Sequence, residues 1–264
     1  MTQTRPLALV TGASSGIGLE LARQFGENGY DLILNAEDTG VDAAADDLVE
    51  TGASIRSVQE DLSTDEGVRR LWATVTAMGR PLDAAALNAG VGEGGPFLET
   101  DLADEMEIID VNVRSTVQLA KLVLRDMAAR DEGRVLVTSS IASTMPGSFQ
   151  AVYNASKSFL QSFAEALRNE LRDTNVVVTS LMPGPTETNF FHRAEMDDTK
   201  VGQSEKDDPA QVAKQGFQAL MKGKDKIVAG SLKTKAQGAA NKVLPDKVKA
   251  AAHRQMAEPG SGEH

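Results

Sequence analysis

The stretch TGASSGIG, residues 11–18, decides the fold of this chain. It brings three glycines together directly after the apolar run of residues 7–10, where a strand is expected to end and a helix to begin. Glycines let a backbone turn tightly, and the amino end of a helix offers free N–H groups with a partial positive charge. The stretch therefore predicts a phosphate-binding turn for a dinucleotide. Its spacing is Gly-x-x-x-Gly-x-Gly, not the commoner Gly-x-Gly-x-x-Gly, so an ordinary structural turn is the alternative.

Short apolar runs alternate with longer segments of helical period along the chain. The runs are mostly apolar throughout, which strands covered on both faces require. The strands are predicted at residues 7–10, 31–34, 54–58, 82–87, 134–137, 176–181 and 227–229, and the helices at 16–28, 41–51, 65–78, 102–130, 153–173 and 209–222. Repeated strand-then-helix units predict an α/β fold, a doubly wound parallel sheet of the Rossmann type with about seven strands and helices on both faces.

The chain is predicted to form one catalytic domain, residues 1–230, followed by a C-terminal extension, residues 231–264. The extension alternates lysines with alanines and glycines and closes in EPGSG at residues 258–262, so we expect it to be helical and then frayed. We place it on or near the substrate side. A solvated appendage is the alternative.

Composition narrows the classes of function. The chain has 264 residues, 41% of them hydrophobic, and a formal charge of -11. This acidity argues against non-specific binding to nucleic acid or to an anionic membrane surface. The absence of cysteine excludes disulfides and thiolate chemistry. His192 and His253 lack metal-ligand spacing, so no metal is expected. No signal region and no apolar span of membrane length is found, which predicts a cytoplasmic protein.

Two further motifs follow the glycine stretch in order: Asn88-Ala89-Gly90, and Tyr153-Asn154-Ala155-Ser156-Lys157. With TGASSGIG they make residues 5–230 resemble the short-chain dehydrogenase/reductase family. The resemblance implies a nicotinamide dinucleotide along the carboxyl ends of the strands. It also implies a Tyr, assisted by Lys, Ser and Asn, that handles the proton accompanying hydride transfer.

The residues themselves support this chemistry. A phenol with a pKa near 10 needs help to exchange a proton at neutral pH, and Lys157, one helical turn from Tyr153, can lower that pKa. Tyr153 is the predicted general acid/base. The resemblance assigns Ser140 to polarising the substrate oxygen, with Ser139 as the alternative. It assigns Asn112 to holding a water beside Lys157 in a proton relay, with an ordinary polar helix position as the alternative.

Cofactor contacts are expected along the same strand ends. Asp61 is implied to meet the adenine, and Thr188 the nicotinamide carboxamide; Thr186 stands where the family often has Val or Ile. The predicted cofactor-binding set is Gly12, Ser14, Ser15, Gly16, Ile17, Gly18, Glu37, Asp61, Leu62, Asn88, Ala89, Gly90, Tyr153, Lys157, Pro183, Gly184, Thr186 and Thr188.

Glu37 favours NAD over NADP. It falls where NADP-preferring relatives tend to carry Arg, and a carboxylate about 4 Å from a 2′-phosphate would repel it by ~1–4 kcal/mol. Against this, Ala36 stands where the family's usual NAD marker is an Asp. An outward Glu37, with Asp38 meeting the ribose instead, is the alternative.

The expected activity is an NAD(P)-dependent interconversion of a secondary alcohol and a ketone. The alternative is a dinucleotide-binding regulatory or scaffold protein with little turnover. Residues 145–150 and 189–196 are predicted to lie over the site and to suit a partly apolar small molecule, although Phe190, Phe191 and Met196 also fit core contacts. Apolar positions along the two long helices predict a homodimer or homotetramer.

Overall fold

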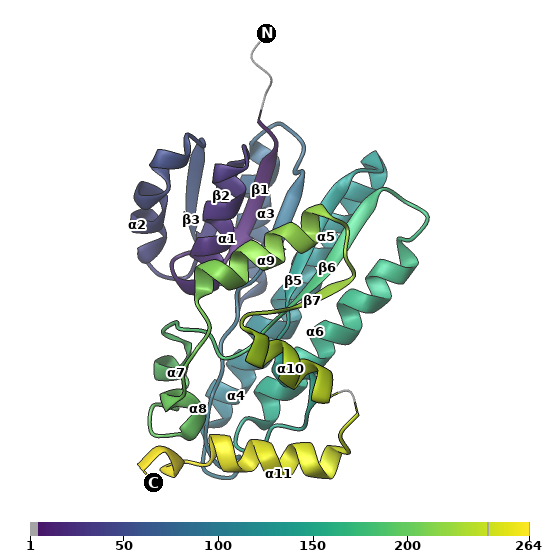
Figure 1. Cartoon of the computed structure of the whole chain (residues 1–264). Helices are drawn as coiled ribbons and strands as arrows, with labels where there is room; N and C mark the ends of the chain where they lie inside the picture. Colours follow the sequence, from purple (N-terminus) through teal and green to yellow (C-terminus); the bar gives the residue numbers. More distant parts are fainter. Residues whose placement is uncertain (1–4, 242, 264) are drawn as a thin grey trace.

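The structure is a computed structural model that describes residues 5–241 and 243–263. Its centre is a parallel sheet with the strand order β3-β2-β1-β4-β5-β6-β7 (Figure 1). The strands are β1 (Leu7–Thr11), β2 (Asp31–Ala36), β3 (Ile55–Gln59), β4 (Ala84–Leu87), β5 (Gly133–Thr138), β6 (Val176–Pro183) and β7 (Lys226–Ala229). The strand order reverses at β1, which pairs with β2 on one side and β4 on the other. The predicted doubly wound parallel sheet is confirmed.

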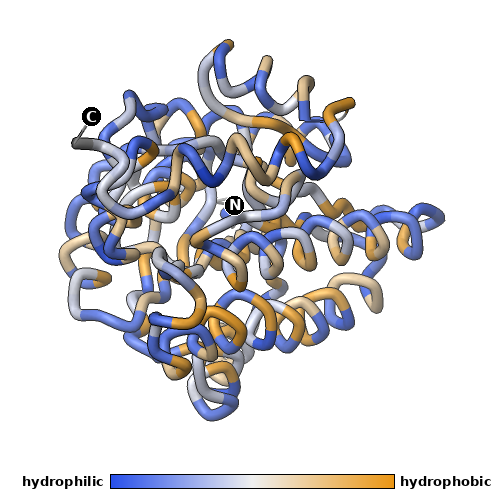
Figure 2. The backbone as a smooth tube through the Cα atoms, turned by 90° about the horizontal axis from the view of Figure 1, so that it is seen from below, coloured by the Kyte–Doolittle hydropathy of each residue, from blue (hydrophilic) through white to orange (hydrophobic). Residues whose placement is uncertain are grey.

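Helices cover both faces of the sheet. One face carries α1 (Gly16–Glu27), α2 (Gly40–Asp47) and α9 (Pro209–Met221), and the other carries α3 (Asp65–Ala77), α5 (Thr116–Arg130) and α6 (Ala151–Glu170). Hydrophobic and hydrophilic residues alternate along the helices, as expected where each has one buried side (Figure 2).

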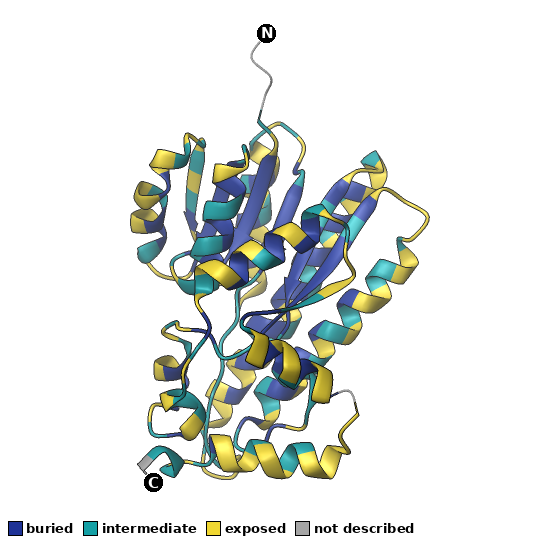
Figure 3. Cartoon of the chain, in the orientation of Figure 1, coloured by how far each residue is buried: buried dark blue, intermediate teal, exposed yellow. Residues whose placement is uncertain are grey.

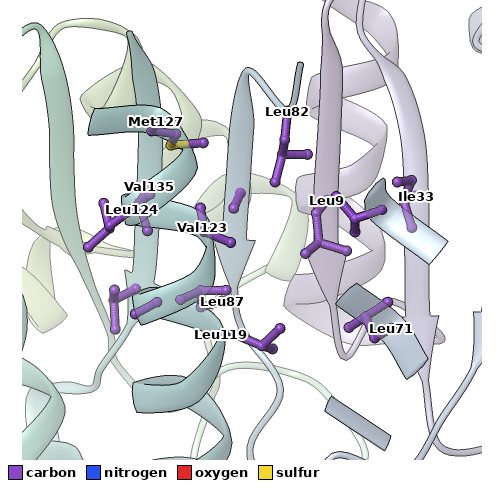
Figure 4. Packing of buried hydrophobic residues seen from close by; sticks show 14 of the residues in the cluster. Leu9, Ile33, Leu71, Leu82, Leu87, Leu119, Val123, Leu124, Met127 and Val135 are labelled. Atoms are coloured by element: carbon purple, nitrogen blue, oxygen red, sulfur yellow. The ribbon is translucent and has the colours of Figure 1, made fainter. Parts of the chain in front are cut away.

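Two hydrophobic clusters lie on the two sides of the sheet. Alternate residues of each strand point to opposite faces, so Leu9 of β1 packs under α3 and α5 while its neighbour Val10 packs under α1. Figure 4 shows Leu87 beside Leu119 and Val123 of α5, with Leu9, Ile33 and, from α3, Leu71 in the neighbouring part of the same cluster. Burial on both faces is why the central strands are apolar throughout (Figure 3).

The predicted helix at 102–130 differs from the structure. It consists of α4 (Leu102–Ile108), a π-helical stretch (Ile109–Ser115) and α5. A π-helical turn contains more residues than an α-helical turn, so the side chains that follow it point in a different direction around the helix axis. The apolar periodicity of the sequence does not reveal this change. Such stretches are frequent at functional sites, and this one contains Asn112.

Short helices follow β6 and β7. They are α7 (Phe190–Arg193), α8 (Lys200–Gln203), α10 (Leu232–Ala240) and α11 (Asp246–Ala257). In Figure 1, α11 crosses the end of the molecule below α10, and the chain then runs beside α8. Among the described residues, no helix is both long and apolar enough to cross a membrane.

Candidate active site

A cleft of about 290 Å³ opens at the carboxyl ends of the strands, where β1 and β4 diverge to opposite helical layers. Such a switch point is where open α/β sheets bind ligands. The predicted site residues that line the cleft are Gly12, Ser14, Ser15, Gly16, Ile17, Gly18, Glu37, Asp61, Leu62, Asn88, Ala89, Gly90, Ser140, Tyr153, Lys157, Pro183, Gly184, Thr186 and Thr188. Asn112 lies behind this lining.

The glycine turn has the shape that a pyrophosphate requires. Gly16 begins α1 with φ +55°, a left-handed conformation that favours glycine. A Cβ on Gly18 would lie 1.9 Å from the backbone oxygen of Gly12, so the turn closes only without a side chain there. The first turn of α1 contains no acidic residue. No carboxylate of the helix itself therefore opposes its N–H groups and dipole, and the residues of this turn fit a bound dinucleotide.

Asn88 ties this turn to the neighbouring strands. Its Nδ2 donates to the Thr11 carbonyl over 3.2 Å, and its Oδ1 accepts from the Thr138 hydroxyl over 3.0 Å. The Thr11 hydroxyl accepts from the N–H groups of both Asn88 and Ala89. These bonds hold the ends of β1, β4 and β5 together.

Tyr153, Lys157 and Ser140 meet in the cleft beyond the turn. Burial raises the pKa of the Tyr153 phenol to about 12, while a hydrogen bond with Ser140 acts in the opposite direction. Burial also lowers the pKa of Lys157 to about 8. Its Nζ lies 5.7 Å from the centroid of the Tyr153 ring and donates to the Thr138 carbonyl over 3.2 Å. The expected net lowering of the Tyr153 pKa is not found, because burial raises it by more than the Ser140 hydrogen bond lowers it.

Ser139 and Ser140 have different surroundings. The Ser139 hydroxyl is buried and donates to the backbone carbonyl of Lys157 over 2.9 Å, which fixes α6 against β5. The Ser140 hydroxyl lines the cleft and accepts from the Ala142 N–H over 3.0 Å. Both serines line the cleft, but the Ser139 hydroxyl is already bonded to the α6 backbone, whereas the Ser140 hydroxyl lies beside Tyr153.

Asn112 is buried and braces the loop after β4. Its Oδ1 accepts from the Val91 N–H over 2.9 Å, and its Nδ2 donates to the Val91 carbonyl and to the Ser156 hydroxyl. A Cβ on Gly90 would lie 3.1 Å from both Asn112 Oδ1 and Lys157 Nζ. Asn112 thus adjoins Lys157 with only Gly90 between them.

A cation that the sequence did not predict lies beside the end of β2. Arg193 of α7 lies 4.0 Å from the Glu37 carboxylate, although the two residues are far apart in the sequence. Asp38 is exposed, and its carboxylate accepts from the Ser14 hydroxyl and the Gly40 N–H beside the glycine turn. Burial, and the charges of Glu37 and other nearby carboxylates, raise the pKa of Glu107. The surroundings of Arg193 are therefore strongly acidic.

Residues 189–196, which the sequence predicts to lie over the site, contact both a hydrophobic cluster and the cleft. Phe191 and Met196 are buried in a small cluster with Ala194 and Ala257. Phe190 packs against the same cluster, and its ring centroid lies 5.1 Å from that of Tyr153; both Phe190 and Phe191 also line the cleft. Packing in the core and facing the cleft are therefore combined in Phe190 and Phe191.

Several groups in and around the cleft could not be predicted from the sequence, because they depend on contacts with distant segments. Arg193 is one, and the Thr138 carbonyl that receives Lys157 is another. The side chains of residues 241–257 that line the cleft are a third group. No local motif marks any of them, because each depends on a partner distant in the sequence.

Comparisons with known proteins agree with this geometry. Residues 6–199 match the family described as short chain dehydrogenase. Retinol dehydrogenase 8 of Bos taurus is 33% identical over 189 residues, which cover 69% of this chain and 59% of that protein, so less than two thirds of that relative is matched. NADP-dependent 3-hydroxy acid dehydrogenase YdfG of Salmonella typhi is 31% identical, covering 75% of this chain and 80% of that protein.

Solved structures show the same fold. A short-chain dehydrogenase from Sphingobium yanoikuyae in complex with NADPH has a TM-score of 0.79 at 25% identity, covering 84% of this chain and 87% of that one. One from Burkholderia phymatum in complex with NAD has a TM-score of 0.80 at 24% identity, covering 92% and 94%. The chain belongs to the short-chain dehydrogenase/reductase family, a family of oxidoreductases, and the resemblance found in its sequence is confirmed.

Proposed function

We propose that the protein interconverts a secondary alcohol and a ketone, using a nicotinamide dinucleotide as hydride carrier. The observation that carries this proposal is the placement of Tyr153, Ser140 and Lys157 in one cleft with the glycine turn. A bound nicotinamide supplies or accepts the hydride. The chain must then bind the dinucleotide, hold the carbonyl or alcohol oxygen, and move one proton.

Tyr153 is assigned the proton transfer. With a pKa raised to about 12 the phenol is protonated at neutral pH, so it is ready to donate to a ketone oxygen during reduction. Ser140 shares that oxygen and polarises the carbonyl. Lys157, charged below its pKa of about 8, stabilises the phenolate that remains after donation. Asn112 fixes the loop beside Lys157, and we assign it the water that returns the proton.

We propose NAD as the preferred cofactor. Arg193 lines the cleft together with Glu37, and the Glu37 carboxylate 4.0 Å away opposes its charge. Asp61 lines the same part of the cleft and adds a further carboxylate. A 2′-phosphate bound there would meet more negative than positive charge. NADP is the alternative that the binding experiment below distinguishes.

We propose that two or four copies assemble through the face formed by the π-helical stretch and α6. Large apolar side chains are exposed there, with Phe97 56%, Phe159 42% and Ile109 39% exposed. They border an apolar groove together with Val113 and Val152. Apolar surface of this kind on a monomer marks an interface, and a second copy of the same face would cover it.

Titration of the purified protein with NADH and NADPH, followed by nucleotide fluorescence, is the first test. We expect tighter binding of NADH. The second is turnover of a ketone panel by the protein and by Tyr153→Phe, which should bind NADH unchanged yet lose at least about 100-fold in kcat. Undiminished turnover by that variant would refute Tyr153 as the proton donor. NADH binding without turnover of any ketone would favour the regulatory alternative.

A further inference from the structure

Residues 241 and 243–263, which we call the C-terminal strap, cross the substrate end of the cleft. Asn241 Nδ2 donates to the Thr144 hydroxyl over 2.9 Å, and Lys249 Nζ donates to the Thr144 carbonyl over 2.8 Å. His253 Nδ1 lies 3.0 Å from the Ser148 carbonyl oxygen. These three contacts attach the strap to the loop between Ser140 and Tyr153.

The far end of the strap is attached to the opposite wall. The N–H groups of Gly260 and Gly262 donate to Asp198, through its carboxylate over 2.6 Å and its carbonyl over 2.8 Å. Ala257 of α11 is 1% exposed and packs with Phe191 and Met196. The strap therefore joins the two segments that flank the catalytic residues, a position that a solvated appendage would not hold.

One face of α11 lines the cleft. Its lining residues are Lys249, Ala252, His253, Met256 and Ala257, a spacing that places them on one side of a helix. Ala252 and Met256 make that wall apolar. The Lys249 ammonium is 2.7 Å from the Asp246 carboxylate, so its charge is already paired. His253 is the remaining polar group of this helix face.

The hydrogen bond to Ser148 determines what His253 can offer. A carbonyl oxygen only accepts, so Nδ1 must carry the proton, and in the neutral ring Nε2 is then an acceptor. Burial lowers the pKa of His253 below its ordinary value, which keeps the ring neutral at pH 7 and above. Among residues 5–241 and 243–263, Nε2 has no hydrogen-bond partner.

We propose that His253, on the wall that the C-terminal strap forms, determines substrate specificity: its Nε2 accepts a hydrogen bond from a hydroxyl group of an otherwise apolar ketone or alcohol. This inference rests on the proposed oxidoreductase function and names its substrate class. The hydroxyl in question lies away from the reacting carbon, because Tyr153 and Ser140 hold the reacting oxygen.

Benzylacetone and its para-hydroxy derivative test the inference, since they differ by one hydroxyl on an apolar body. We expect the protein with NADH bound to prefer the para-hydroxy ketone by about tenfold in kcat/KM and in affinity. His253→Phe keeps a ring but removes the acceptor, and should abolish the preference without changing NADH affinity. His253→Gln, whose amide oxygen accepts, should restore part of it.

The inference would be overturned if the original protein, like His253→Phe, showed the same kcat/KM and affinity for both ketones. It would also be overturned if the protein bound NADH but neither ketone. Failure to bind either dinucleotide would instead overturn the proposed function. A readout independent of turnover is the ¹⁵N spectrum of the His253 ring. We expect the Nδ1–H tautomer, and an Nε2 signal that moves with the para-hydroxy ketone but not with benzylacetone; an Nε2–H tautomer would refute the assignment.

A second pair of variants tests the wall itself. Met256→Trp places a bulky ring in the cleft, whereas Gln255→Trp places it on the neighbouring residue, which is exposed and does not line the cleft. We expect at least tenfold weaker binding of both ketones in the first variant only, with NADH binding intact in both. Equal effects of the two substitutions would show that α11 does not form the substrate wall.

Discussion

Lys157→Met should make the protein more stable while removing its proposed activity. Lys157 is only 4% exposed, and burial lowers its pKa from 10.5 to about 8. This difference corresponds to about 3 kcal/mol of destabilisation at pH 7, where the folded protein must hold a buried ammonium. Methionine fills similar space without a charge. Its substitution also removes the hydrogen bond to the Thr138 carbonyl, a loss of about 1 kcal/mol.

The net expectation is a gain of about 2 kcal/mol at pH 7, or roughly 4–8 °C in Tm. The sign of its pH dependence follows from the lowered pKa. Between about pH 8 and 10.5 the unfolded chain binds more protons at residue 157 than the folded chain does, so this group's contribution to stability rises with pH. The advantage of the variant should therefore shrink to about zero near pH 10.

Thermal unfolding of the protein without added dinucleotide, at pH 7 and at pH 10, measures both quantities. Lys214→Met is the matched control, because Lys214 is an exposed residue of α9 and its replacement should change Tm little at either pH. A Lys157→Met protein that is less stable at pH 7, or whose advantage is the same at both pH values, would refute the reasoning. That result would mean that the ammonium is stabilised where it lies.

Four further outcomes are expected. Gly18→Ala should abolish NADH binding and lower Tm, since its Cβ would lie 1.9 Å from a backbone oxygen of the same turn; a variant that binds NADH normally would contradict the described turn. Ketone reduction should be constant from pH 6 to 7.5 and decline above about 8 as Lys157 loses its proton, whereas Lys157→Arg should remove that decline; steady-state rates across this range check both. Phe159→Asp should shift the mass measured by light scattering toward the monomer, and a monomeric original protein would refute the proposed interface. Glu37→Ala should tighten NADPH binding by about tenfold by freeing the neighbouring guanidinium, and an unchanged NADPH affinity would show that Glu37 does not set the preference.

The sequence by itself determined the architecture of this protein. Runs such as residues 7–10 and 31–34 are apolar throughout because strands covered on both faces leave no polar side, and helical periodicity marks the layers between them. The glycine turn and the four-residue spacing of Tyr153 and Lys157 are local patterns too. The glycine turn requires space for a close backbone approach, and the Tyr153–Lys157 spacing corresponds to one helical turn. Both causes act within a few residues, so the sequence alone reveals them.

The chemical environment of the candidate site residues was decided only by the tertiary structure. Burial sets the protonation of Tyr153 and Lys157, and desolvation depends on every segment packed around them. Arg193 contacts Glu37, and His253 contacts the loop before Tyr153. Both contacts arise because helices near the C-terminal end of the sequence pack over the ends of strands that precede them in the sequence. Contacts between such distant segments leave no period or motif in the sequence, since the partners share only a place in space.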